Sequence, residues 1–129
     1  MKRVITFGTF DVFHIGHLNV LERARAFGDH LTVGVSSDAL NVEKKGRSAV
    51  FPESQRMRIV QALRCVDDVF LEESLQAKAE YLQRYSSDVL VMGNDWEGKF
   101  DHLSEYCEVR YLSRTPSIST TATIERIRQ

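Results

Sequence analysis

Two histidines, His14 and His17, stand three positions apart just after a Gly-Thr-Phe-Asp turn at residues 8–11. An apolar run at residues 4–7 precedes the turn, and residues 18–27 follow with apolar side chains at helical spacing. This order predicts a strand, a tight turn and a helix. The free backbone N–H groups at the start of such a helix favour an anion, most often a phosphate.

The imidazoles of both histidines add donors at the same place. Residues three apart lie on one face of a helix, so His14 and His17 face the same way if the helix has begun by His14. A protonated or N–H-donating imidazole there hydrogen-bonds a phosphate, and Gly16 leaves room for a ligand to approach the backbone. The alternative is an ordinary strand–helix connection with two incidental surface histidines. A pair flanked by two glycines after a strand favours the phosphate site.

Apolar runs suited to strands alternate along the chain with segments of helical spacing. Alternating units of this kind predict an α/β fold, a Rossmann-like parallel five-stranded sheet with helices on both faces. Strands are predicted at residues 4–7, 31–36, 68–71, 89–93 and 109–112, helices at residues 18–27, 52–64, 75–85 and 119–128, and a mobile basic loop at residues 41–50.

Ligands of parallel sheets bind beyond the carboxyl ends of the strands. Four segments therefore converge on one crevice: the histidine turn, the Asp38 region, residues 93–96 and Arg114–Thr115. Arg114 carries a planar guanidinium suited to phosphate, and the hydroxyls of residues 119–121 cap a helix start or donate to phosphate oxygens. The ordinary alternative for this segment is a helix cap beside a surface arginine.

The composition indicates an ordinary globular protein. The chain has 129 residues and a formal net charge of -1, with 43% hydrophobic residues. We expect one domain over residues 1–129, with no global electrostatic attraction to nucleic acid. The start of the chain lacks a long apolar segment, so we expect a cytoplasmic protein without membrane insertion. Cys65 and Cys107 lie far apart in apolar settings and are expected to be buried free thiols.

Two motifs resemble those of a known superfamily. His-x-Gly-His after a Gly-Thr-Phe-Asp turn resembles the signature of the nucleotidyltransferase superfamily, which includes the cytidylyltransferases. Residues 114–121 resemble the Arg-Thr-x-Gly-Ile-Ser-Thr-Thr motif of the cytidylyltransferases, with Ser117 in place of the glycine and Pro116 before it. This departure stiffens the loop and removes one position that easily adopts a positive φ.

A third stretch narrows the resemblance to one branch of the family. Residues 93–101, Gly-Asn-Asp-Trp-Glu-Gly-Lys-Phe-Asp, resemble the corresponding stretch of the glycerol-3-phosphate cytidylyltransferases, and the likeness extends from Val4 to Thr121. The resemblance implies a reaction of CTP with sn-glycerol 3-phosphate that forms CDP-glycerol and pyrophosphate. It also implies Mg²⁺ or another divalent cation, a homodimer, and a product that feeds teichoic acid or capsule polymers.

The resemblance and the residue chemistry together give a set of candidate site residues. The catalytic candidates are His14, His17, Lys44 and Arg114. The nucleotide-binding candidates are Gly8, Thr9, Phe10, Gly16, Asp95, Arg114, Thr115, Ser119 and Thr120. The candidates for the phosphorylated acceptor are Asp38, Arg56, Arg64 and Trp96. Asp11 is either a metal ligand or a structural turn residue, because a carboxylate close to three phosphates repels them unless Mg²⁺ lies between.

The predicted reaction needs positioning more than proton transfer. A phosphate monoester has its second pKa near about 6, so the acceptor is mostly dianionic at neutral pH and needs no strong base. Catalysis then consists of holding it in line with the α-phosphorus of CTP and stabilising the developing charge. Two alternatives stay open. One is a cytidylyltransferase or adenylyltransferase for another small phosphorylated alcohol or sugar phosphate, and the other is a non-catalytic nucleotide-sensing module.

Overall fold

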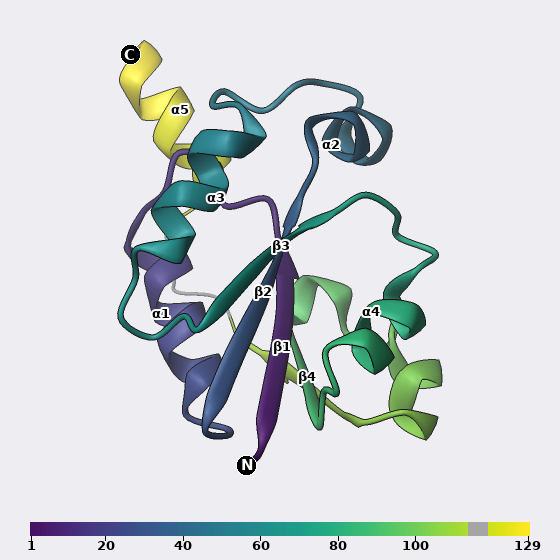
Figure 1. The fold of residues 1–129 in the computed structure, drawn as a ribbon. Coiled ribbons are helices and arrows are strands. Elements are labelled where there is room, and N and C mark those ends of the chain that lie inside the picture. The colour runs from purple at the N-terminus through teal and green to yellow at the C-terminus, as the bar shows by residue number, and fades with distance from the viewer. Residues whose placement is uncertain (114–118) are drawn as a thin grey trace.

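The structure, a computed structural model, describes residues 1–113 and 119–129. Its centre is one parallel sheet in the order β3-β2-β1-β4-β5 (Figure 1). The strands are β1 (Arg3–Gly8), β2 (His30–Ser36), β3 (Asp68–Glu72), β4 (Val89–Gly93) and β5 (Glu108–Leu112). The strand order reverses between β1 and β4, and this kind of switch point opens a crevice at the carboxyl ends of the strands.

Helices cover both faces of the sheet. They are α1 (Ile15–Arg25), α2 (Asp38–Lys45), α3 (Glu53–Gln61), α4 (Lys78–Arg84) and α5 (Thr120–Arg128), with short 3₁₀ helices η1 (Asn94–Trp96) and η2 (Asp101–Glu105). In Figure 1, α1 and α3 lie on one side of the sheet and α4 lies on the other. α2 and α5 lie at the end of the molecule where the strands finish.

Two apolar clusters, one on each face, hold these layers together. Side chains of a strand alternate between faces, so Val4 of β1 packs with Leu21 and Val60 from α1 and α3. The next residue, Ile5, packs on the other face with Leu82 of α4. Both strand residues are almost fully buried, as expected for a strand covered on both sides.

The predicted fold class is confirmed. The structure contains all five predicted strands and the predicted parallel sheet with helices on both faces. The predicted loop at residues 41–50 was wrong over its first half, because α2 continues to Lys45. Ser37 caps this helix by accepting from the Leu40 N–H, and Gly46 ends it in the left-handed region at φ 72°.

The helix predicted over residues 75–85 is shorter in the structure, where α4 begins at Lys78. Neither 3₁₀ helix was predicted, because each is too short to show a helical period. Over the described ranges, no helix is both long enough and apolar enough to cross a membrane.

Candidate active site

A cavity of about 710 Å³ lies at the carboxyl edge of the sheet. Its volume is within the range of roughly 300–1,000 Å³ that small-molecule sites occupy. Its walls come from the β1–α1 turn, α2 with the loop after it, η1 and α5. Those segments contribute, among others, Gly8, Thr9, Phe10, Asp11, His17, Lys44, Asp95, Trp96 and Thr120. Of the four segments predicted to converge, the histidine turn and residues 93–96 line this cavity, and α2 contributes Asn41 and Lys44 rather than Asp38. The fourth segment, Arg114–Thr115, lies outside the described residues.

The two histidines cap α1 and fix each other. His14 is the N-cap residue, and its Nδ1 accepts from the Gly16 N–H at 3.0 Å. His17 lies three residues later, and its Nδ1 accepts from the His14 N–H at 3.2 Å. The two rings stack with centroids 3.9 Å apart. This is a capping box built from imidazoles, in which each side chain satisfies a backbone donor at the helix start.

These contacts decide which ring nitrogen carries the proton. A ring nitrogen that accepts a hydrogen bond from a backbone N–H carries no proton, because its lone pair is the acceptor. The proton of each neutral ring therefore lies on Nε2. The Nε2 atom of His14 is buried and has no hydrogen-bond partner among the residues that the structure describes. His17 lines the cavity. Each histidine therefore has an N–H donor that is not used by the backbone of α1.

Burial keeps both imidazoles neutral. It lowers the pKa of His14 from its usual value. The pKa of His17 is lowered to about 4, first by burial and then by the neighbouring His14, while Asp11 opposes the shift. At neutral pH both rings are therefore mainly neutral and carry an N–H at Nε2. This agrees with the N–H-donating form of the two that the sequence allowed, and the contact with a phosphate stays a prediction.

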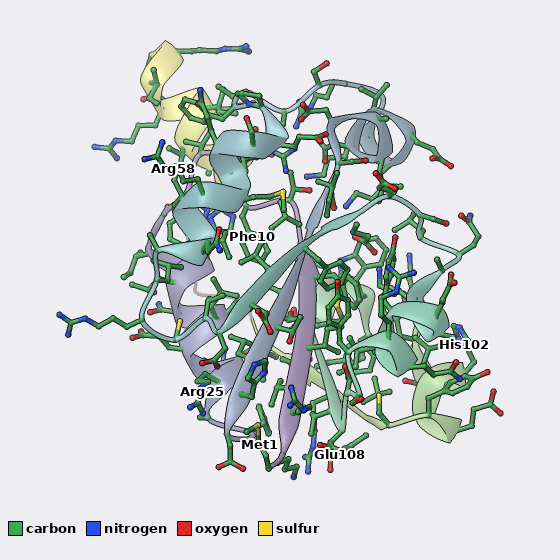
Figure 2. All side chains as sticks on the ribbon, viewed as in Figure 1. Met1, Phe10, Arg25, Arg58, His102 and Glu108 are labelled. Atoms are coloured by element: carbon green, nitrogen blue, oxygen red, sulfur yellow. The ribbon has the colours of Figure 1, made fainter. Side chains whose placement is uncertain are left out.

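The turn before α1 is strained at residues other than glycine. Phe10 has φ 55° and Val12 has φ 47°, both in the left-handed region that side chains with a Cβ disfavour. The Phe10 ring packs among the apolar residues between α1, α3 and the sheet (Figure 2). A Cβ at position 8 would lie 2.9 Å from this ring, so Gly8 is needed for close approach. Strain of this kind is characteristic of functional sites.

Asp11 connects three segments around the cavity. Its two carboxylate oxygens accept from the Val50 N–H at 2.7 Å and the Phe51 N–H at 3.0 Å. Its carbonyl accepts from the Thr120 hydroxyl at 2.8 Å. Asp11 thus holds the loop after α2 and the start of α5 against the histidine turn. This is the structural alternative given for Asp11, and its role as a metal ligand stays a prediction.

The described residues do not form a ready-made metal cage. Within residues 1–113 and 119–129, no group of three or more His, Cys, Asp or Glu side chains is arranged to hold a metal ion. The carboxylate of Asp11 already accepts two backbone N–H groups. A resident metal site therefore does not fit these side chains. Mg²⁺ is commonly held by substrate phosphates with one or two carboxylates, so a divalent cation would belong to the nucleotide substrate.

Lys44 reaches the cavity from the last turn of α2. Its Nζ donates to the Ser36 hydroxyl at 2.8 Å. The pKa of Lys44 is lowered to about 8, mainly by burial and also by Lys45, whereas Glu72 opposes the shift. Near neutral pH the ammonium is still charged and faces the cavity, which suits contact with an anionic ligand.

Two residues predicted to contact the acceptor make contacts within the protein framework. Arg56 is 1% exposed and donates to the carbonyl oxygens of Thr9, Ser36 and Phe51 and to Asp38. Asp38 also accepts from the Glu53 N–H, which joins the starts of α2 and α3. Neither Arg56 nor Asp38 is among the residues that line the cavity. Their substrate contact stays a prediction, and the observed contacts give them a positioning role.

The other predicted residues are placed as follows. Ser119 accepts from the Ala122 N–H and so caps α5. Gly16 lies buried in the first turn of α1. Arg64 is exposed in the α3–β3 connection, which leads to the amino end of a parallel strand, so the structure does not bring it to the cavity. Arg114 and Thr115 lie outside the described residues.

Sequence reasoning missed several residues of the cavity wall. The most informative is Asn41, whose Oδ1 accepts from the Thr9 hydroxyl at 2.9 Å and so ties α2 to the histidine turn. Asn41 and Lys44 lie on one face of α2, and this helical spacing was the available signal. Lys45 of α2, Lys99 after η1 and Arg128 of α5 also line the cavity.

Comparison with known proteins gives a consistent set of likenesses. The family described as Cytidylyltransferase-like matches residues 5–126. The chain is 47% identical over 121 residues to a glycerol-3-phosphate cytidylyltransferase of Bacillus spizizenii, covering 94% of this chain and 93% of the relative. It is 46% identical over 127 residues to the protein of that name from Bacillus subtilis, covering 98% of each.

A solved structure carries the same fold. The lipopolysaccharide core biosynthesis protein of Thermoplasma volcanium superposes with a TM-score of 0.76 at 25% identity, covering 89% of this chain and 98% of that chain. The arrangement of sheet and helices is therefore one that this solved protein shares.

Proposed function

This chain belongs to the cytidylyltransferase-like family, and from this premise we infer that it transfers the cytidylyl group of CTP to sn-glycerol 3-phosphate. As a member of this family it is a nucleotidyltransferase. Relatives that bear the name glycerol-3-phosphate cytidylyltransferase match it at 46–47% identity over nearly the whole of both chains. The products are CDP-glycerol and pyrophosphate.

One observation carries the inference at the level of chemistry. The imidazoles of His14 and His17 turn their Nδ1 atoms to the backbone and keep their Nε2–H donors for another partner. They do so at the N-terminus of α1, where the helix dipole also favours negative charge. An anion such as a nucleotide phosphate fits this set of donors.

The reaction needs one displacement at phosphorus. An oxygen of the dianionic acceptor phosphate attacks the α-phosphorus of CTP and forms the new P–O bond. The bond from the α-phosphorus to the oxygen bridging to the β-phosphate breaks, and its electron pair leaves with pyrophosphate. No proton has to be removed from the acceptor, so the reaction needs no general base, and the lowered pKa values of His14 and His17 are consistent with this.

His17, Lys44, Asp95 and Trp96 line the cavity, whereas His14 does not, and each candidate residue is given a task in this displacement. We assign the Nε2–H donors of His14 and His17 to phosphate oxygens that gain negative charge in the transition state. Lys44 and Arg114 are assigned to the β- and γ-phosphates and so to the departing pyrophosphate. Mg²⁺, held by the phosphates of CTP, would neutralise part of their charge. Asp95 and Trp96 line the cavity from η1 and are assigned to the nucleoside and acceptor end.

The test is pyrophosphate release by the purified protein with Mg²⁺ and CTP, with and without sn-glycerol 3-phosphate. We expect release only when both substrates are present, with CDP-glycerol identified by its mass. Release with ATP in place of CTP, or with another phosphorylated alcohol or sugar phosphate, would replace the proposed substrates. A protein that binds CTP but releases no pyrophosphate with any acceptor would be a nucleotide-sensing module.

Two further proposals follow from the family alone. We propose that the protein forms a homodimer, which a light-scattering measurement of molar mass in solution tests directly. We also propose that CDP-glycerol made by this enzyme feeds a polymerase of teichoic acid or capsule type. Loss of glycerol phosphate polymer from cells that lack the gene is the expected result.

A further inference from the structure

A buried network of charged and polar groups contacts Lys44 behind the cavity wall. Glu72, at the end of β3, and Lys78, at the start of α4, are 1% and 4% exposed, and Lys78 Nζ donates to Glu72 Oε2 at 2.6 Å. The Ser36 hydroxyl lies 3.4 Å from Glu72 Oε1, and Lys44 Nζ lies 2.8 Å from the same hydroxyl. Of these four side chains, only Lys44 lines the cavity.

The direction of each hydrogen bond in this network is fixed by chemistry. An ammonium only donates and a carboxylate only accepts. The Ser36 oxygen must therefore accept from Lys44, and its single proton is turned to Glu72. Lys78 donates to the other oxygen of the same carboxylate. In this orientation the Ser36 hydroxyl accepts from Lys44 and donates to Glu72 at the same time.

The charges of the network leave one ammonium without a direct carboxylate partner. Glu72 is paired with Lys78, whose Nζ also lies 4.2 Å from the centre of the Phe7 ring. Charged groups from four elements act on Lys44. Glu72 of β3 favours its protonated form, while Lys45 of α2, Lys78 of α4 and Arg56 of α3 oppose it. Because burial opposes the charge as well, Lys44 gains from an anion in the cavity.

We propose that Glu72 is a positioning residue for the nucleotide site: through Ser36 it holds the Lys44 ammonium at the cavity wall, while Lys78 competes for the same carboxylate. The inference rests on the proposed function, in which Lys44 contacts the phosphates of CTP. Glu72 itself touches no substrate. Its influence passes through one hydroxyl and through the electrostatic field of a buried carboxylate.

A purely structural pair of Glu72 and Lys78 would give a different result. Such a pair joins α4 to the sheet, and removing either partner would lower stability in the same direction. The proposed network instead predicts opposite effects on Lys44. Loss of the Glu72 charge lowers the pKa of Lys44, whereas loss of the Lys78 charge raises it, because one group stabilises the ammonium and the other repels it.

The experiment measures the Lys44 pKa and CTP binding in the full-length protein. The variants are Glu72→Gln, Lys78→Met and the double variant Glu72→Gln/Lys78→Met. ¹³C-labelled lysine gives the pKa of Lys44 by NMR, with Lys44→Arg used to assign its signal. The Kd for CTP is then followed from pH 6 to pH 10. In the wild type, binding should weaken as pH rises through about 8, where Lys44 loses its charge.

We expect Glu72→Gln to move the NMR titration and the loss of CTP binding to lower pH by about one unit. Lys78→Met should move both to higher pH, and the double variant should fall between the two. Ser36→Ala keeps every charge and should weaken CTP binding several-fold near pH 6, where Lys44 is mostly charged. Lys44→Arg should abolish the weakening near pH 8, because a guanidinium does not titrate in this range.

The outcomes separate this inference from the proposed function. If Glu72→Gln and Lys78→Met shift the Lys44 pKa in the same direction, or not at all, the positioning role is wrong while CTP binding still stands. If the wild type does not bind CTP, the proposed function fails, yet the NMR titration still decides the effect of Glu72 on Lys44. Should Glu72→Gln not fold, the shifts in Lys78→Met and the double variant decide in the same way.

Discussion

Replacing His17 separates its two roles, because the side chain both caps α1 and is assigned to a phosphate. His17→Ala removes the acceptor for the His14 N–H and the Nε2–H donor together. His17→Glu removes only the donor, since a glutamate at this position of a capping box accepts from the same backbone N–H. It also places a negative charge at the helix N-terminus, which suits the helix but repels a phosphate.

The expected effects differ in size. Loss of a helix cap costs about 1 kcal/mol, against an unfolding free energy of roughly 5–15 kcal/mol, so at least about 99% of His17→Ala molecules stay folded. Loss of one preorganised donor to the transition state costs about 10²–10³-fold in turnover. We therefore expect His17→Ala to lose about two to three orders of magnitude in kcat with a small loss of stability. His17→Glu should regain the stability and be at least as inactive.

The assay pairs pyrophosphate release with urea unfolding of each variant. Arg25→Ala is a matched control, because Arg25 lies at the other end of α1 (Figure 2), where it donates to the Gly28 carbonyl at 2.6 Å. We expect Arg25→Ala to lose about 1 kcal/mol of stability and to keep its turnover within about threefold. A His17→Glu protein with near wild-type turnover would show that position 17 acts only as a cap, and would refute the donor role.

Four other perturbations have defined outcomes. Asp11→Ala should speed hydrogen exchange at the amides of residues 50–51 by about tenfold or more, because both amides lose their carboxylate acceptor. It should also raise KM for CTP. Unchanged exchange at these amides would contradict this prediction. Arg56→Ala should lower the free energy of unfolding, measured in urea, by about 3 kcal/mol or more, because the buried carbonyl oxygens of Thr9 and Ser36 lose their donor. Arg56→Lys should not restore stability, since an ammonium lacks the planar set of donors. Full rescue by lysine would contradict this. Val12→Asn should unfold at equal or higher temperature, because asparagine tolerates the left-handed conformation at φ 47° better than valine; a clearly lower Tm would mean that valine packing outweighs strain. Stability should fall between pH 6.5 and about 4, because the unfolded chain binds a proton at His17 first; an equally steep fall in His17→Ala would assign it to other groups.

Much of the fold was accessible from the sequence because its signals are local and redundant. The apolar strands around Ile5 and Leu90 are buried on both faces, and each stands between segments of helical spacing. Connections between parallel strands are almost always right-handed, and this rule leaves few possible topologies for the sheet. The basic segment that begins at Asn41 was harder to predict. Its helix, α2, contacts the histidine turn through the polar side chain of Asn41, and its apolar residues show little helical spacing.

The site was predictable only in part, for a physical reason. A motif gives residue types and spacing, so His14 and His17 were placed correctly at the helix start. The sequence does not say which groups a long side chain reaches, so the guanidinium of Arg56 was expected at a substrate and lies under backbone carbonyls instead. The contact of Glu72 with Lys78 and Ser36 depends on the pairing of β2 with β3, which no local pattern encodes.

The central claim is that the acceptor phosphate joins the α-phosphorus of CTP in one displacement. Its most direct test uses sn-glycerol 3-phosphate carrying ¹⁸O at the three non-ester oxygens of its phosphate, with mass analysis of both products. We expect CDP-glycerol to retain all three labelled oxygens and pyrophosphate to carry none. Labelled pyrophosphate, or CMP formed without CDP-glycerol, would contradict the proposed reaction.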